Sequence, residues 1–278
     1  MNRKPINASH APLRESPLNA QQLYIKKHHR HHHLVAMLRL LVLISFLTIW
    51  ECAGRFEIID TFFFSSPCMV LSFFTEMLRD GSFFTHTGIT LLETLISFLL
   101  ITAVSILFAT LLWYSKTLSE ITEPFLVVLN SLPKSALAPL FIVWLGTGVN
   151  TIIVAGISVA IFGSIINLYT GFKSVDSEKL KLIKTLGGNR FDAFHKVVLP
   201  SSIPTILSNM KVNIGLALVG VIIGEFLAAR RGLGYLIIYG SQVFQLNMVI
   251  TSIIILCVIA MGLYQCIQWA EHYYKKRA

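Results

Sequence analysis

The chain has 278 residues, of which 54% are hydrophobic and only 13% are charged. Because a soluble domain carries about 25% charged residues, this composition excludes an ordinary soluble enzyme and a disordered chain. The net charge is +9, from 23 Lys and Arg against 14 Asp and Glu. Such a charge is typical either of nucleic-acid binding or of membrane orientation, so the positions of the basic residues decide between the two.

Residues 1–33 are polar and basic, and they include a run of His, Lys and Arg at 26–33. We interpret this segment as a cytoplasmic tail and residues 34–278 as a transmembrane domain. The His run lacks acidic or Cys partners, which favours a basic tail near lipid headgroups over a metal site. The apolar run 34–50 is not followed by a small-residue cleavage site, so we expect a retained first span.

Five further runs reach the length of about 20 residues that a membrane-spanning helix needs. They are residues 89–114, 121–145, 149–171, 206–226 and 248–269. Each must be helical, since lipid offers no partner to backbone polar groups. The apolar segment 62–77 is too short and too interrupted to span, so we expect an interfacial or re-entrant helix there. The predicted fold is an all-α polytopic membrane protein with about six transmembrane helices.

The basic residues are unevenly divided between the two sides of this topology. With the N-terminus inside, the inner segments hold sixteen Lys and Arg, whereas the outer segments near 51–88 and 229–246 hold four. This bias predicts that both termini are cytoplasmic and that the protein lies in the inner membrane. No module that combines basic and aromatic residues is present, so we expect no nucleic-acid partner.

The inner segment 172–205 predicts two short amphipathic helices. The first should begin after Asp176, and Gly187 should end it. Its apolar residues recur at helical spacing: Leu182, Ile183 and Leu186. The second helix places four apolar residues on one side: Phe191, Phe194, Val197 and Val198. We expect Pro200 to end it. Such helices either dock to a soluble partner or lie on lipid headgroups.

The same segment carries a resemblance to a known family. Leu186-Gly187, followed by Phe194 and Leu199-Pro200, resembles the cytoplasmic loop of binding-protein-dependent ABC importer permeases. Further signatures are similar to those of the nitrate, taurine and aliphatic-sulfonate branch of that family. They lie at residues 130–140, 174–176, 224–229 and 232–235. The likeness extends over about residues 85–275.

This resemblance implies a type I importer permease fold and an ATP-driven importer of a small solute, of the sulfonate, taurine, nitrate or vitamin-precursor type. Two permease copies, as a homodimer, would form the pore. Two ATPase subunits would bind the cytoplasmic loops, and a substrate-binding protein would dock outside. The chain would then be no enzyme and bind no cofactor, because ATP and Mg belong to the ATPase. The alternative from the residues alone is an ion-coupled secondary transporter, with Glu93 and Glu225 as acidic candidates.

The resemblance assigns coupling to the ATPase to ten residues of the inner segment. They are Asp176, Lys181, Leu182, Ile183, Leu186, Gly187, Phe191, Phe194, Leu199 and Pro200. One departure stands out, because residues 181–183 are Lys-Leu-Ile where the family has Glu-Ala-Ala. We therefore expect an acidic or neutral site near Lys181 in the groove of the partner ATPase.

The predicted pathway residues are Asn130, Pro133, Lys134, Pro139 and Glu225. The two prolines predict an irregular third span, in which the Lys134 cation either attracts an anionic solute or reaches out to water. Glu225 either gates the pathway, orders the loop at 232–234, or pairs with an outer arginine. Four small residues predict close helix packing, within the subunit rather than between copies: Gly156, Gly163, Gly220 and Gly224.

Overall fold

A computed structural model describes residues 17–277 of the chain, which divide into two compact units, one ending at Ile59 and the other beginning at Asp60. The regular structure of these described residues is helical throughout. In the first unit, helix α1 (Pro17–Arg55) contains the second half of the basic segment 1–33. The first half of that segment lies outside the described residues. The apolar part of α1, Met37–Arg55, is long enough to cross a membrane.

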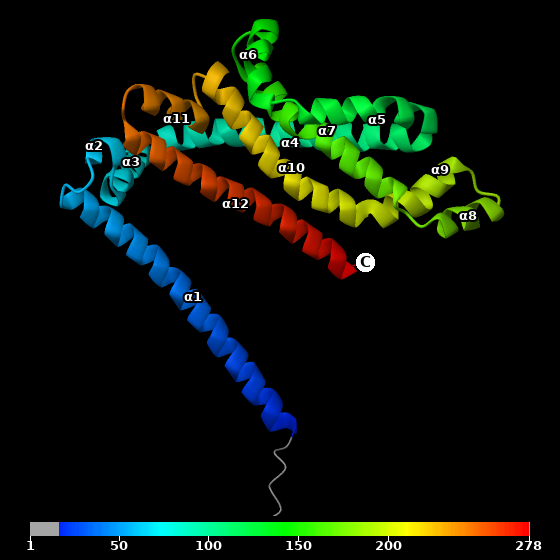
Figure 1. The fold of residues 1–278 in the computed structure, drawn as a ribbon, viewed down its shortest axis with the longest axis horizontal. Helices are drawn as coiled ribbons and strands as arrows, with labels where there is room; N and C mark the ends of the chain where they lie inside the picture. Colours follow the sequence, from blue (N-terminus) through cyan, green and yellow to red (C-terminus); the bar gives the residue numbers. More distant parts are fainter. Residues whose placement is uncertain (1–16, 278) are drawn as a thin grey trace, which may run out of the picture. The chain divides into compact units, whose positions relative to one another are not determined.

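The second unit contains the rest of the helices (Figure 1). In chain order they are α2 (Thr61–Phe64), α3 (Pro67–Arg79), α4 (Ser82–Tyr114), α5 (Lys116–Ser131), α6 (Lys134–Leu145), α7 (Val149–Lys173), α8 (Ser177–Thr185), α9 (Arg190–Ala193), a π-helical turn (Phe194–Val198), α10 (Leu199–Ala228), α11 (Leu233–Gln242) and α12 (Leu246–Arg277). Helices α8 and α9 lie at one end of this unit, and α2, α3 and α11 lie at the other (Figure 1).

The number of spans agrees with the sequence prediction. Five described helices pass the length and hydropathy requirements for a span, and the pair α5 and α6 makes a sixth if it crosses as one bent unit. The segment 62–77 forms only α2 and the 13-residue α3, which is too short to cross. Large apolar side chains remain exposed along the spans, as expected of helices that face lipid. The prediction of about six transmembrane helices is therefore confirmed.

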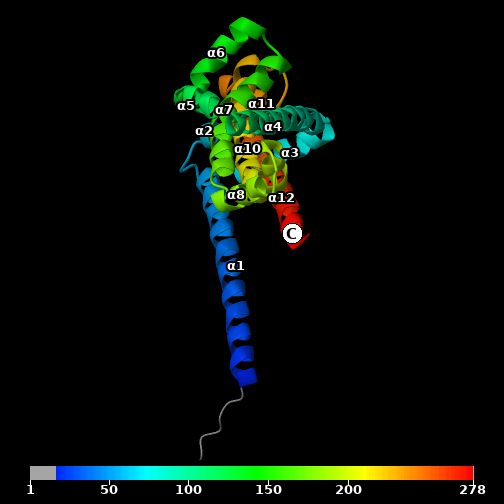
Figure 2. The ribbon, with the colours of Figure 1, turned by 90° about the vertical axis from the view of Figure 1, so that its right-hand side faces the viewer.

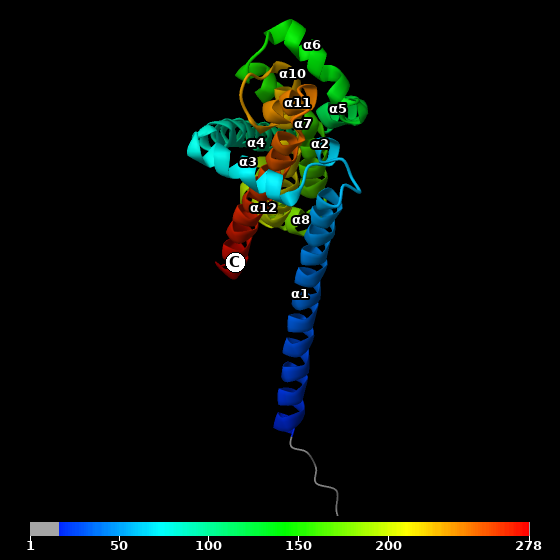
Figure 3. The ribbon, with the colours of Figure 1, turned by 90° about the vertical axis from the view of Figure 1, so that its left-hand side faces the viewer.

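The third predicted span is broken between α5 and α6, which meet at an angle of 96°. Pro133 causes the break, because a proline disfavours helical geometry in the residue before it. Leu132 accordingly has an extended backbone, with φ −64° and ψ 140°. Helix α6 lies at the margin of the second unit in two opposite side views (Figure 2 and Figure 3).

Helix α7 packs along both α4 and α10, and these three helices form the centre of the second unit. One buried cluster joins them: Phe98, Ile101, Ala160, Ile214 and Ala217. A second cluster, at the end that holds α3 and α11, joins α3, α10, α11 and α12 through Met77, Leu218, Leu233, Leu236, Ile255 and Leu256. At the start of α4, hydrogen bonds from the side chain and the amide of Ser82 hold the pKa of Asp80 below its usual value.

The contact between α7 and α10 is close because of glycine. A Cβ atom on Gly220 would lie 2.8 Å from the Cα of Gly156 and 2.9 Å from the carbonyl oxygen of Ala155. A Cβ atom on Gly224 would lie 2.9 Å from the Cα of Ile152. The neighbouring atoms belong to the backbone, so they cannot turn aside as a flexible side chain could. These glycines therefore let the two helices approach to backbone contact within one subunit.

We expect Gly220→Ala to lower the thermal stability of the purified protein, because its methyl group must push two helix backbones apart. Overpacking of this kind typically costs about 1–3 kcal/mol. The matched control is Gly215→Ala in the same helix, where an added Cβ meets nothing within 4 Å. The measurement is the unfolding temperature of both variants in the same detergent. Equal unfolding temperatures for the two variants would contradict the packing argument.

Candidate functional site

The inner segment 172–205 is built around helix α8. The Asp176 carboxylate caps its first turn by accepting a hydrogen bond of 2.9 Å from the amide of Glu178. Gly187 follows the helix with φ +81°, in the left-handed region that favours glycine. The start and the end of this helix therefore lie where the sequence predicts them.

Three large apolar side chains of this segment remain exposed. Leu182 is 58% exposed, Leu186 is 74% exposed and Phe191 is 60% exposed. We call these three residues the docking face. Lys181 is exposed beside them, whereas Ile183 is half-buried. The docking face is unlike an ordinary polar loop, because it keeps apolar groups free for a partner.

The other half of the segment is buried against the spans. Phe194 is only 4% exposed, and its ring centroid lies 5.3 Å from that of Trp113, 5.5 Å from that of Tyr114 and 5.7 Å from that of Phe172. Val198 is fully buried in the same cluster. We call Phe194 with its three aromatic neighbours the aromatic joint. It connects the inner segment to the ends of α4 and α7.

An arginine reinforces the aromatic joint. Arg190 Nη1 donates a hydrogen bond of 2.6 Å to the carbonyl oxygen of Tyr114, the last residue of α4. A capping box between Asn189 and Asp192 fixes the start of α9. The inner segment therefore has an exposed half and a half that is tied to the spans.

The expectation that Pro200 ends the second helix is wrong. Leu199 and Pro200 lie in the first turn of α10, and helical structure continues from Arg190 to Ala228. The π-helical turn before Leu199 widens the helix, so that the chain continues past the proline ring and its missing N–H group. The inner segment is therefore continuous with α10.

A second group of functional residues lies at the opposite end of α10. Three side chains capture three consecutive amides at the start of α11. The Gly232 amide donates to His86 Nδ1 (3.0 Å), the Leu233 amide to Thr90 Oγ1 (2.8 Å), and the Gly234 amide to Glu225 Oε2 (2.5 Å). Thr90 Oγ1 in turn donates to Glu225 Oε1 at 2.6 Å. We call His86, Thr90 and Glu225 the amide clamp.

The amide clamp satisfies backbone donors that the first turn of a helix otherwise leaves unpaired. Thr90 is fully buried and Glu225 is 1% exposed, so water cannot replace these bonds. A Cβ atom on Gly234 would lie 2.7 Å from Glu225 Oε2, and Gly232 is equally crowded by the Glu225 carboxylate. Only glycine therefore lets the loop approach the carboxylate this closely.

Sequence reasoning missed His86 and Thr90, and it named Glu93 only as an acidic candidate of the alternative secondary transporter. Glu93 is 1% exposed, and its carboxyl group lies beside that of Glu225. His86, Thr90 and Glu93 recur at intervals of four and three residues along α4. Such polar spacing inside an apolar span is a helical stripe, and it could have revealed the clamp.

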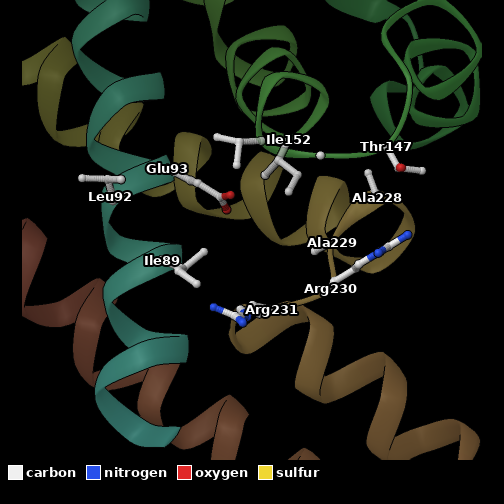
Figure 4. Close-up of a pocket in the computed structure, with 11 residues that line it drawn as sticks. Ile89, Leu92, Glu93, Thr147, Ile152, Ala228, Ala229, Arg230 and Arg231 are labelled. Atoms are coloured by element: carbon white, nitrogen blue, oxygen red, sulfur yellow. The ribbon is translucent and has the colours of Figure 1, made fainter.

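A pocket of about 490 Å³ opens beside the amide clamp (Figure 4). Its walls are mostly apolar, from the beginnings of α4 and α7 and the end of α10. The polar lining includes Glu93, Thr147, Arg230 and Arg231. The carboxyl group of Glu93 points into it, while Arg231 reaches toward Ile89 and Arg230 toward Thr147 (Figure 4). Among the ion pairs of the described residues, none joins Glu225 to either arginine.

The remaining predicted pathway residues surround the break between α5 and α6. Lys134 Nζ donates to the carbonyl oxygens of Leu129 (3.1 Å) and Leu132 (2.9 Å), and also to that of Asn130. The ammonium group thus neutralises the carbonyl end of α5. A Cβ atom on Gly163 would lie 3.0 Å from Asn130 Oδ1, so α5 also packs closely on α7. Pro139 lies inside α6.

Comparisons with known proteins give a consistent result. Residues 101–277 match the family described as binding-protein-dependent transport system inner membrane component. A probable ABC transporter permease of Haemophilus influenzae is 30% identical over 84% of this chain and 94% of that protein. A putative aliphatic sulfonates transport permease of Bacillus subtilis is 28% identical over 77% of each chain. The inward-facing methionine transporter MetNI shares the fold, with a TM-score of 0.59, 15% identity, and coverage of 68% of this chain and 94% of that chain.

Proposed function

The chain belongs to the family of binding-protein-dependent transport system inner membrane components, and we propose that a separate ATPase drives alternating access in it through the inner segment 172–205. It is an ABC importer permease subunit for a small solute, and it crosses the cytoplasmic membrane several times. Membership of this family implies an ATPase and a substrate-binding protein as partners. We further propose a homodimer of permeases with two ATPase subunits, which bind the ATP and Mg.

The observation that carries this proposal is the division of the inner segment into two halves. The docking face of Leu182, Leu186 and Phe191 offers apolar side chains to a soluble partner, as an amphipathic helix offers them to a groove. The aromatic joint holds the other half against α4 and α7. A partner that binds the first half can therefore pull on the spans through the second.

We propose a small organic anion of the sulfonate type, or a vitamin precursor, as the solute. The relative from Bacillus subtilis, whose name refers to aliphatic sulfonates, supports this class. The test is uptake into vesicles that contain the complete complex. Uptake should require ATP and the binding protein and should survive collapse of the proton gradient. Uptake driven by an ion gradient without ATP would instead establish a secondary transporter.

We expect Phe191→Asp to abolish binding of the ATPase while the permease still reaches the membrane. A carboxylate in the middle of an apolar contact must be desolvated without a partner, which is strongly unfavourable. The measurement is co-purification of the ATPase with a tagged permease. The matched control is Phe244→Asp, because Phe244 has a similar exposure of 59% and follows α11 at the opposite end. If both variants, or neither, lost the ATPase, the assignment of the docking face would be wrong.

A further inference from the structure

The pocket beside the amide clamp combines an apolar body with polar groups that lack partners. Its volume of about 490 Å³ is sufficient for a small organic molecule. Residues of α4, α7 and α10 line it, so the helices at the centre of the second unit meet there. It lies at the end of α10 away from the inner segment, which is the outer end in the predicted topology.

The first unpartnered group is the carboxyl group of Glu93. The side chain is 1% exposed, and its Oε2 atom accepts no hydrogen bond from the described residues. A buried acceptor without a donor is costly, and a pocket is where a ligand can supply the donor. The hydroxyl group of Thr90 and the amide of Gly234 both donate to Glu225, so neither is available to Glu93.

The second unpartnered group is a pair of cations at the same pocket. Arg230 and Arg231 are adjacent in the chain and both are exposed. Within the part of the chain that the structure describes, no carboxylate forms an ion pair with either. Guanidinium groups bind planar or tetrahedral oxyanions through several hydrogen bonds at once. The pocket therefore presents donors for an anion on one side and an acceptor on another.

We propose that this pocket is a solute-binding site of the permease itself, and that it binds a small organic anion which also carries an N–H donor. Arg230 and Arg231 bind the acidic group, the apolar wall covers the carbon chain, and Glu93 accepts from the nitrogen. Glu93 is then the residue that selects solutes with a nitrogen over those without one. This inference rests on the proposed import of a small organic anion. It adds a site within the membrane subunit that distinguishes one solute from another.

The headgroup of phosphatidylethanolamine has the same chemistry, since it joins a phosphate to an ammonium group. The free solute is favoured because residues of three helices of the central bundle, α4, α7 and α10, converge on the pocket and bring the buried carboxyl group of Glu93 into it. The experiment must nevertheless separate the two sources. We therefore specify the lipid in each measurement.

The test is equilibrium binding of two labelled probes to the purified permease–ATPase complex in nanodiscs of phosphatidylcholine, without ATP or binding protein. The probes are taurine and ethanesulfonate, which differ only by the amino group. The wild-type complex should bind taurine at least about tenfold more tightly than ethanesulfonate, because a hydrogen bond to a charged group contributes that much to the binding free energy. Glu93→Ala should remove this preference without weakening ethanesulfonate, and Glu93→Gln, which keeps an acceptor and the side-chain volume, should reduce it. Arg231→Gln should weaken both probes.

Matched controls are Glu76→Ala and Arg79→Gln, which change exposed charges of α3 outside this pocket. The proposal is overturned if the wild-type complex binds neither probe, or if Glu93→Ala keeps the preference for taurine. It is also overturned if nanodiscs of phosphatidylethanolamine abolish taurine binding, because the pocket is then a lipid site. Since binding is measured without ATP, it does not depend on ATP-driven transport. A complex that binds taurine but imports nothing would contradict only the proposed function.

Discussion

Phe194→Ala should uncouple the transporter, leaving the ATPase bound but strongly reducing ATP-driven uptake. Removing a buried phenyl ring typically costs about 3–5 kcal/mol, because the surrounding side chains collapse only partly into the cavity. Three aromatic neighbours would lose their contact with the inner segment, while the docking face would be unchanged. The coupling between two sites then falls by about 2 kcal/mol, or roughly 30-fold in the transport rate. The measurement is uptake into vesicles, together with co-purification of the ATPase.

The control for this experiment lies three residues away. Phe191→Ala removes the same ring from an exposed position, so it should weaken binding of the ATPase without destabilising the permease. Phe194→Leu keeps most of the buried volume and should retain partial uptake, which guards against simple misfolding of the alanine variant. If Phe194→Ala and Phe191→Ala behaved alike in both measurements, the aromatic joint would have no separate role.

Glu225→Ala should destabilise the end of the protein at which α11 lies and stop uptake. The substitution leaves the Gly234 amide and the Thr90 hydroxyl without their acceptor, in a place that water does not reach. Each buried polar group left unpaired costs about 1–3 kcal/mol. Glu225→Gln keeps one of the two acceptor oxygens and the side-chain volume, so its loss should be intermediate.

Thermal unfolding of the purified complex, followed for wild type, Glu225→Gln and Glu225→Ala, is the measurement that checks this order. Thr94→Ala is a suitable control, because the Thr94 hydroxyl donates only to the carbonyl of Thr90 in its own helix. The Thr94→Ala substitution should change the unfolding temperature little. Equal effects of glutamine and alanine at position 225 would show that the carboxylate does not hold the loop.

The sequence was sufficient to predict the spans, because a membrane-spanning helix must be long and apolar and polar interruptions within lipid are unfavourable. The two prolines predicted an irregular third span, and the structure has a break in that span at Leu132 and Pro133. Two other signals were misleading. Pro200 suggested the end of a helix, but the π-helical turn before it lets the helix continue. The outer segment 229–246 suggested a loop, yet α11 forms there.

Helix α11 shows why part of the site could not be predicted. It has ten residues, too few for a stable helix in isolation, so tertiary contacts must hold it. Leu233 and Leu236 anchor it in a buried cluster, and the amide clamp satisfies its first turn. The clamp joins residues that are 135 positions apart, Thr90 and Glu225. Periodicity reports which residues share a helix face, but it does not report which faces meet.

Helix α10 has 30 residues and runs without a break from the inner segment to the clamp, a length of about 45 Å. Close backbone contact with α7 at Gly220 and Gly224 ties its outer half to that helix. If the pair moves as one rigid body in the proposed alternating access, it tilts about a point between its two ends. A tilt imposed at the inner end must appear at the outer end in the opposite direction, so the movement that closes one side opens the other. Alternating access to the two faces of the membrane would then need no separate signal at the outer end, because the stiff pair of helices carries the movement there.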